Sequence, residues 1–229
     1  AIYAGNNLEA LTEAQGILQT VSDRCNELGS RPWLVDQIPF ESVYGEAAAR
    51  IRYLRSMLLL LSVCLLLHSA GAMERKRGLM ELLKSTPDGR SQLVLCKLTS
   101  AAVCLACLWL PNMVGEVHAY LSLGGAETLD APIQAILPLY QLSLRCSIRA
   151  FLILIYCARF MVLFSLGCIV VAISFRLRRN SAALLTALTL LVLPSALWLY
   201  FELPFFSSFS TVRLLDFIEL ATKGLNYLG

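Results

Sequence analysis

The sequence predicts an all-α, polytopic membrane protein with at least four transmembrane helices and a helical hairpin outside the membrane. The chain has 229 residues, of which 57% are hydrophobic and only 15% charged, against roughly 25% charged residues in an average soluble domain. Its apolar residues gather in long uncharged runs, and a bilayer core requires roughly 20 mostly apolar residues of helix. Buried helices of a soluble protein are the alternative, but core helices rarely run so long without a polar face.

The connections between the apolar runs favour one orientation in the membrane. Six Lys or Arg lie within 74–97 and three more within 176–179, whereas the connection 115–147 carries three acidic residues and one Arg. Positively charged loops stay on the cytoplasmic side, so the first and third spans are expected to run inward and the second and fourth outward. The four expected spans are 56–73, 93–114, 150–175 and 181–201.

Residues 1–55 are expected to form the helical hairpin outside the membrane. Apolar residues recur every three or four positions along 11–28, which is the period of an amphipathic helix. The Gly-Ser-Arg-Pro sequence at 29–32 ends this stripe, and a second stripe along 40–54 runs into the first span. Both are shorter than a coiled coil requires, so we expect them to pack against each other. Three basic residues on this outer side conflict with the charge rule, namely Arg50, Arg52 and Arg55.

The end of the chain, 204–229, is expected to form an interfacial or re-entrant helix on the outer side. Its apolar residues are interrupted by charges, and each charge at the bilayer centre costs roughly 2.5–3.5 kcal/mol, which disfavours a fifth span. The chain begins with Ala and shows no signal peptide, although an outer first segment requires an earlier span or signal. We therefore expect this chain to be part of a longer protein.

The cysteines do not form the motif of a metal site. Five of the eight lie within apolar runs, where Cys acts as a small hydrophobe. Cys104 and Cys107 have the spacing of a zinc pair, but no second pair follows. A disulfide between Cys25 and Cys146 is left open. Metalloprotease, nucleophile-elbow and phosphate-loop motifs are absent from the sequence, so we expect no metal, no cofactor, no enzymatic activity and no nucleic-acid partner.

Three polar residues within or beside the expected spans are candidates for a functional site, namely Arg159, His68 and Glu202. Arg159 lies ten residues into the third span, and an intramembrane charge is so costly that it marks a functional site by default. Its guanidinium should find several carbonyls or a carboxylate such as Glu202 or Glu116. We expect His68 and His118 to be hydrogen-bonded or interfacial. An intramembrane enzyme would require Arg159 and these histidines to meet in one cavity.

The charged segment 74–92, between the first two spans, is the best indication of function. Its basic residues 75–77 would lie at the cytoplasmic headgroups, and Gly78 permits a sharp change of chain direction. Residues 79–84 form one or two amphipathic turns suited to the membrane interface, and the Thr-Pro-Asp-Gly sequence at 86–89 fits a type I turn. An ordinary basic loop is the alternative interpretation of these features.

This segment resembles the coupling region of ABC-transporter permeases of the type 2 export family. The family pattern runs from a Glu and a Gly, through Glu-Leu-Leu and a Thr-Pro turn, to a Lys that enters the next span, and this chain has Glu74, Gly78 and Lys97 in those places. A weaker resemblance covers 133–201, so that the whole extends over roughly 50–205. The implied ATPase-coupling residues are Glu74, Arg77, Gly78, Glu81, Leu82, Leu83, Thr86, Pro87 and Arg90.

The resemblance implies a permease subunit of an ATP-driven ABC exporter in a cell membrane, most simply the bacterial cytoplasmic membrane. It implies a separate ABC ATPase subunit, a second permease subunit and membrane lipid as partners, and leaves the substrate open among lipids, peptides, drugs and polysaccharides. Family members usually have six spans, so the four found here depart from the pattern. A membrane-anchored interaction or sensor protein, with the outer hairpin as its working part, is the alternative. The expected domains are 1–55, 56–203 with the coupling segment 74–92, and 204–229.

Overall fold

The computed structural model describes residues 36–69, 89–136, 146–177 and 179–201. These parts are mostly helical and contain no strand, apart from an isolated bridge between Pro132 and Ser147. Single positions are described elsewhere, namely Thr12, 14–16, 18–19, 22–23, Asn26, Leu139, Leu144, Thr211, Leu215 and Asp216.

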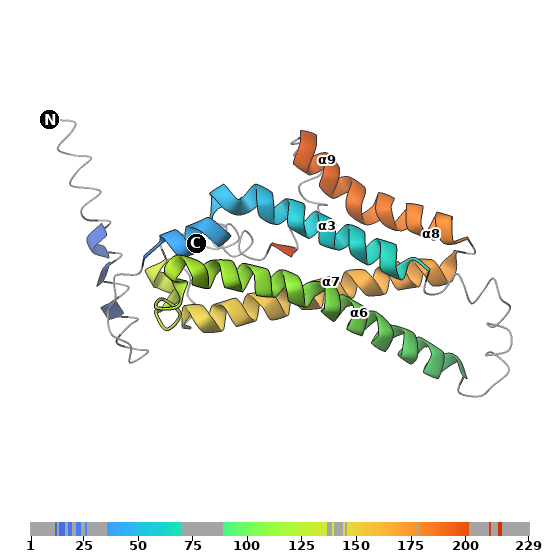
Figure 1. Ribbon diagram of the computed structural model, residues 1–229, viewed down its shortest axis with the longest axis horizontal. Helices are drawn as coiled ribbons and strands as arrows, with labels where there is room; N and C mark the ends of the chain where they lie inside the picture. The colour runs from blue at the N-terminus through green and yellow to red at the C-terminus, as the bar shows by residue number, and fades with distance from the viewer. Residues whose placement is uncertain are drawn as a thin grey trace. The chain divides into compact units, whose positions relative to one another are not determined.

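Figure 1 shows the helical elements of the described part of the chain. The π-turns η2 and η5 each continue a longer helix. In chain order the elements are α2 (Ile38–Tyr44), η1 (Glu46–Ala48), α3 (Ala49–Leu67), α6 (Gly89–Tyr120), η2 (Leu121–Gly125), η3 (Ile133–Ala135), α7 (Ile148–Arg176), α8 (Asn180–Ala187), η5 (Leu188–Val192) and α9 (Leu193–Phe201).

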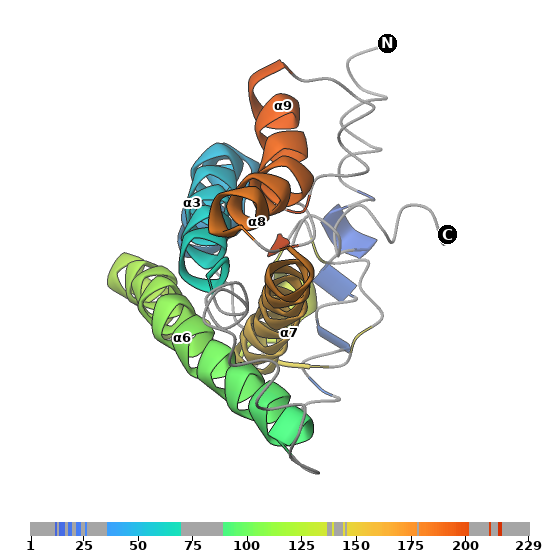
Figure 2. The same ribbon diagram turned by 90° about the vertical axis from the view of Figure 1, so that its right-hand side faces the viewer.

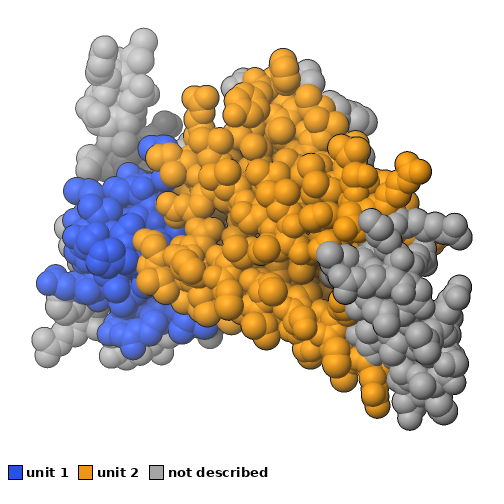
Figure 3. Space-filling model, turned by 45° about the vertical axis from the view of Figure 1, so that its right-hand side comes forward, with its two compact units in different colours: residues 1–48, 116–156, 218–229 blue, residues 49–115, 157–217 orange. Residues whose placement is uncertain are grey.

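The chain divides into two compact units (Figure 3). The division falls within α6 and within α7, so each of these helices contributes to both units. Unit 1 consists of residues 1–48, 116–156 and 218–229, and unit 2 of residues 49–115 and 157–217.

Three helices of the described part are long and apolar enough to cross a membrane, namely Val94–Gly125, Ile148–Arg176 and Asn180–Phe201. The third is formed by α8, η5 and α9 together. They correspond to the second, third and fourth predicted spans. The prediction of an all-α fold with several membrane-length helices is therefore confirmed in this form.

Helix α3 does not belong to this set, although it includes most of the predicted first span. It has 19 residues, but it begins at Ala49, and its first turns carry three arginines. Within the described helix only 56–67 is uncharged, which is shorter than the roughly 20 apolar residues that a bilayer core requires. Residues 70–73 lie outside the described residues, so the first predicted span, 56–73, stays a prediction.

The apolar stripe along 40–54 does not form one continuous helix. Helix α2 ends at Tyr44, and Gly45 adopts an extended conformation with φ −71° and ψ 176°. A β-carbon at Gly45 would lie 2.5 Å from the backbone oxygen of Glu41, so glycine is required for this bend. Tyr44 is buried, whereas Ile51 is 62% exposed. The prediction of one stripe is wrong because the chain changes direction at Gly45.

The outer hairpin is not confirmed by the described residues. Those within 11–28 are helical, as the periodicity predicts. However, Ala14 and Leu18, two members of the predicted packing face, are exposed. The hairpin therefore stays a prediction.

A continuous apolar core holds unit 2 together. Leu60 and Val63 of α3, Leu105 of α6 and Leu163 of α7 are all at most 1% exposed and belong to it. Helices α3, α6 and α7 approach one another closely at Gly167 of α7. A β-carbon there would lie 2.6 Å from Cδ1 of Leu105 and 3.3 Å from Cδ1 of Leu67, and small residues at such points let membrane helices pack closely.

Gly167→Ile is expected to destabilise unit 2 by about 1–3 kcal/mol, because the added side chain overpacks the contact with α6 and α3. The measurement is the thermal unfolding midpoint of the full chain in mild detergent. Gly115→Ile on α6 is the matched control, since a β-carbon there meets nothing within 4 Å. Equal losses in the two variants would contradict the packing argument.

Helices α3 and α7 run parallel in unit 2. The Ser174 hydroxyl donates a hydrogen bond of 2.6 Å to the backbone oxygen of His68, which joins the C-terminal ends of the two helices. In Figures 1 and 2 the end of α3, the start of α6, the end of α7 and the start of α8 lie at one end of this unit. The described ends that flank the two basic segments, 74–97 and 176–179, therefore lie at the same end of unit 2.

Candidate functional site

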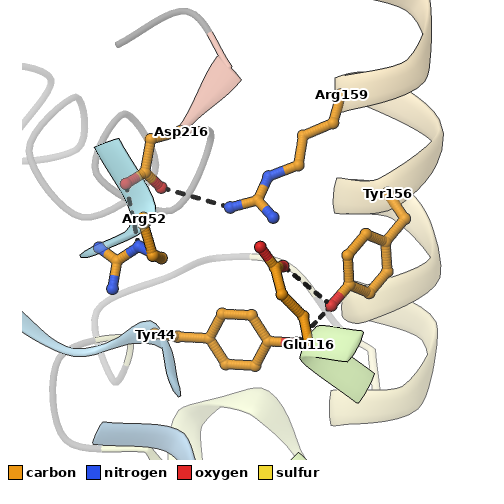
Figure 4. Close-up of polar contacts among 6 residues, drawn as sticks. All are labelled: Tyr44, Arg52, Glu116, Tyr156, Arg159 and Asp216. Carbon is orange, nitrogen blue, oxygen red and sulfur yellow. Dashed lines mark hydrogen bonds and ion pairs between the residues drawn. The ribbon is translucent and has the colours of Figure 1, made fainter. Parts of the chain in front are cut away.

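Unit 2 contains a buried group of three charged side chains, Arg52, Arg159 and Asp216, which we call the ion cluster (Figure 4). Nε of Arg52 donates to Oδ2 of Asp216 at 3.0 Å, and Nη2 of Arg159 lies 3.6 Å from Oδ1. The side chains of Arg52, Arg159 and Asp216 are 7%, 11% and 1% exposed. One carboxylate thus lies between two guanidinium groups that come from α3 and α7.

The ion cluster lies at matching heights on these two parallel helices. Arg52 is 16 residues before His68, and Arg159 is 15 residues before Ser174. At 1.5 Å per residue, both separations are about 23 Å of helix. If the basic end faces the cytoplasm, as the positive-inside rule requires, the ion cluster lies in the outer half of a bilayer core roughly 30 Å thick.

The sequence named Arg159 as a site residue that requires a carboxylate or several carbonyls, and the structure supplies the carboxylate of Asp216. The sequence analysis did not name this partner. Glu202, one of its two acidic candidates, lies outside the described residues. Arg52 was noted only as a conflict with the charge rule, and its burial beside Asp216 removes it from the outer surface. The sequence signal that could have predicted a shared acidic partner is that Arg52 and Arg159 both lie beside or within long apolar runs.

Thr211, which follows the fourth predicted span in the chain, forms hydrogen bonds with the helix Asn180–Phe201 near its π-turn. Pro194 has no N–H and its ring clashes with the carbonyl four residues before it. The π-turn η5 lies immediately before this proline and carries a backbone hydrogen bond that reaches five residues back. The Thr211 hydroxyl donates to the oxygen of Leu191 at 2.7 Å and lies 3.0 Å from the Ser195 hydroxyl.

The described residues near the C-terminus are buried. Thr211 is 9% exposed, Leu215 4% and Asp216 1%, and Leu215 belongs to the apolar core of unit 2. Most of the range 204–229 lies outside the described residues, so the form of this segment stays a prediction.

Unit 1 contains a chain of buried hydroxyl and carboxyl groups (Figure 4). The hydroxyl oxygens of Tyr44 and Tyr156 lie 2.6 Å apart, and the Tyr156 hydroxyl donates to Oε2 of Glu116 at 3.2 Å. The three residues are 2%, 5% and 7% exposed. Because Tyr156 uses its proton on Glu116, Tyr44 donates to Tyr156. Glu116, which the sequence analysis named as a possible partner of Arg159, thus accepts a hydrogen bond from α7 in this unit.

The predicted coupling residues fall mainly outside the described part of the chain. Helix α6 begins at Gly89, so the end of the segment 74–92 forms the first turn of that helix, and Arg90 belongs to this turn. The remaining coupling residues lie outside the described residues, namely Glu74, Arg77, Gly78, Glu81, Leu82, Leu83, Thr86 and Pro87.

His68 is a hydrogen-bonded residue of the turn that follows α3. Its Nδ1 lies 2.8 Å from the backbone oxygen of Leu65, and its own carbonyl accepts the hydrogen bond from Ser174. It therefore lies at the opposite end of α3 from the ion cluster. This separation argues against an intramembrane enzyme in which Arg159 and His68 act on one substrate.

The described residues hold no group of three or more His, Cys, Asp or Glu side chains that could bind a metal ion. The cysteines among them are free thiols. Burial raises the pKa of Cys146, which lowers the fraction of thiolate, the form that binds metals and acts as a nucleophile. Cys25, the other half of the disulfide left open by the sequence, lies outside the described residues.

Comparison with known proteins does not assign a family: no protein-family model matches the chain, and no curated protein or solved structure matches it. A functional assignment therefore rests on the residues of this chain and on their contacts.

Proposed function

We propose that the chain is a transmembrane permease subunit of an ATP-driven ABC exporter of the type 2 family, with the segment 74–92 docked on a separate ATPase subunit. The observation that carries this proposal is the order of residues from Glu74 through Gly78 to Lys97, placed between two long apolar runs. The subunit would act as a multi-pass protein of the cytoplasmic membrane, together with a second permease subunit.

The continuity of α6 supports a coupling role for the segment that precedes it. Helix α6 runs from Gly89 to Tyr120, and its residue Leu105 packs beside Gly167 of α7. A displacement of the coupling segment would therefore be transmitted along one helix into the core of unit 2, because packed helices move as rigid elements rather than deforming continuously.

The ion cluster supports transport over simple anchoring. Ionisable residues within membrane helices are expensive and mark substrate or ion paths by default. An anchor needs only apolar helices, whereas this chain buries Arg52, Arg159 and Asp216 together in unit 2. The substrate path of the proposed permease would accordingly include this cluster.

The affinity-tagged chain, purified in mild detergent from its native membrane, is expected to bring down an ATP-hydrolysing subunit. The measurements are Mg-ATP hydrolysis by the purified material and mass spectrometry of its components. A matched preparation with Gly78→Trp should lose the hydrolysing subunit. If the chain is folded and is crosslinked in the membrane before purification, and still no ATPase co-purifies, the permease proposal is wrong. That result would favour the alternative of a membrane-anchored interaction protein.

A further inference from the structure

We propose that the exposed face of α3 is a binding surface for a phospholipid, with the lipid phosphate at Arg50 and an acyl chain along the leucines that follow it. Helix α3 would then cross the membrane as a fourth span, although arginines lie in its first turns. This lipid surface goes beyond the permease function and is argued from contacts within unit 2.

One side of α3 is apolar and uncovered along the length of the helix. Five of its apolar side chains are between 37% and 62% exposed, namely Ile51, Leu54, Leu58, Leu65 and Leu66. Leu54, Leu58 and Leu65 are spaced by four and seven residues, so they lie on one stripe of the helix. Beside this stripe, the Ser62 hydroxyl donates to the backbone oxygen of Leu58 at 2.9 Å, so it requires no water. An uncovered apolar surface of this kind is typical of a membrane contact.

The length of α3 matches the hydrocarbon core of a bilayer. Its 19 residues span about 28 Å, and the 22 residues of the helix Asn180–Phe201 span about 33 Å, against roughly 30 Å for the core. The two helices pack side by side, and α3 ends where α8 begins (Figures 1 and 2). Since the helix Asn180–Phe201 is long and apolar enough to cross a membrane, α3 would occupy the same depth of the bilayer.

Aromatic side chains mark the other end of both helices. The rings of Tyr53 on α3 and Trp198 on α9 meet edge to face, with their centroids 4.9 Å apart. Tyr200 and Phe201, at the end of α9, are 67% and 68% exposed. Trp and Tyr are enriched where the hydrocarbon core meets the lipid headgroups. The first turn of α3, which contains Arg50, would therefore lie at the level of the headgroups.

The three arginines of α3 differ in their surroundings. Arg52 is buried against Asp216, and Arg55 is half-buried and takes part in interactions within the protein. Arg50 is exposed and lies one turn before Leu54, at the head of the leucine stripe. Side chains of a helix lean toward its N-terminus, and a guanidinium matches phosphate oxygens. Arg50 would thus reach the phosphate of a lipid whose acyl chain covers the stripe.

The first test is quenching of tryptophan fluorescence by phosphatidylcholine that carries bromine on its acyl chains, with the full chain in nanodiscs. Leu58→Trp places the reporter on the proposed surface. Leu185→Trp places it at a 64% exposed position of a membrane-length helix, and Leu18→Trp at a 62% exposed position of the predicted outer hairpin. The signal of the three native tryptophans is subtracted with the unmodified chain.

Leu58→Trp is expected to lose as large a fraction of its fluorescence as Leu185→Trp, and Leu18→Trp should lose little. If Leu185→Trp is quenched and Leu58→Trp is not, then protein covers α3, either a second copy or another segment of this chain. That result would overturn the lipid surface.

The second test measures the choice of headgroup at Arg50. Leu54→Trp places the reporter one turn away, and brominated phosphatidylglycerol should quench it at an about fivefold lower mole fraction than brominated phosphatidylcholine, which carries a cationic group. Adding Arg50→Gln should abolish this preference, whereas Arg50→Lys should keep it. Arg149→Gln is the matched control, because Arg149 is an exposed arginine on α7, and the preference should be unchanged.

Equal quenching by the two lipids, or a preference that survives Arg50→Gln, would overturn the phosphate contact. These measurements need no ATPase subunit, so their failure leaves the permease proposal standing. A failure of ATPase co-purification likewise leaves the lipid surface standing.

Discussion

Asp216→Leu is expected to destabilise the protein by roughly 3–5 kcal/mol, because removing one partner of a buried ion pair leaves an uncompensated buried charge. Two guanidiniums are left here, and both are at least 89% buried by their side-chain exposures of 7% and 11%.

The measurement is thermal or denaturant unfolding of each variant in the same mild detergent. Asp130→Leu is the matched control, because it breaks an ion pair whose side chains are 58% and 79% exposed, and exposed pairs contribute about 1 kcal/mol or less. Replacing Arg52, Arg159 and Asp216 together by Leu should recover most of the loss, as it does when buried ion pairs give way to apolar residues. A loss in Asp216→Leu no larger than in Asp130→Leu would contradict the ion cluster.

The long apolar helices could be predicted from the sequence because their signal is local and long. The third expected span, 150–175, became α7 at Ile148–Arg176, and the fourth, 181–201, became a helix at Asn180–Phe201. A mostly apolar run of this length has few other stable solutions. The first expected span is not among these helices, because three arginines lie in the first turns of α3 before its apolar part.

The bend at Gly45 was not predicted because the helical period is read from apolar positions over a window of many residues, in which a single glycine has little weight. The apolar positions along 40–54 match a helix, but α2 ends at Tyr44 and the extended conformation of Gly45 separates it from η1. Tolerance of an isolated glycine inside a helical pattern is common, so its presence alone did not predict a break. The close approach of Gly45 to the backbone oxygen of Glu41 is a local feature of the end of α2, where the Gly45 N–H donates to that oxygen.

Only one member of the ion cluster, Arg159, could be predicted from the sequence as a site residue. The cost of an intramembrane charge identified Arg159 as a residue that requires a partner. Its partner Asp216 lies 57 residues further along the chain, in a segment whose charges were read as a reason to keep it out of the membrane. The same charge that argued against a fifth span is the one that Arg52 and Arg159 neutralise, and only the fold brings the three together.

Gly78→Trp is expected to uncouple ATP hydrolysis from transport while leaving the subunit folded. The glycine lies between Glu74 and Glu81, which are spaced by seven residues, about two helical turns, and would share one face of a continuous helix. A large side chain at Gly78 would keep a partner from approaching this face. The Leu82→Asp/Leu83→Asp pair should act in the same way by placing two charges where an apolar groove of the ATPase would receive two leucines.

Both variants are expected to lower substrate-stimulated ATPase activity of the reconstituted complex by roughly 30-fold, because interface energy concentrates in a few buried residues worth about 2 kcal/mol or more. The thermal midpoint of the isolated subunit should stay unchanged. Gly16→Trp is the matched control, since a β-carbon at Gly16 meets nothing within 4 Å and this residue lies in the predicted outer hairpin. Loss of function in Gly16→Trp with normal stimulation in Gly78→Trp would transfer the working part to the hairpin and make 74–92 an ordinary basic loop.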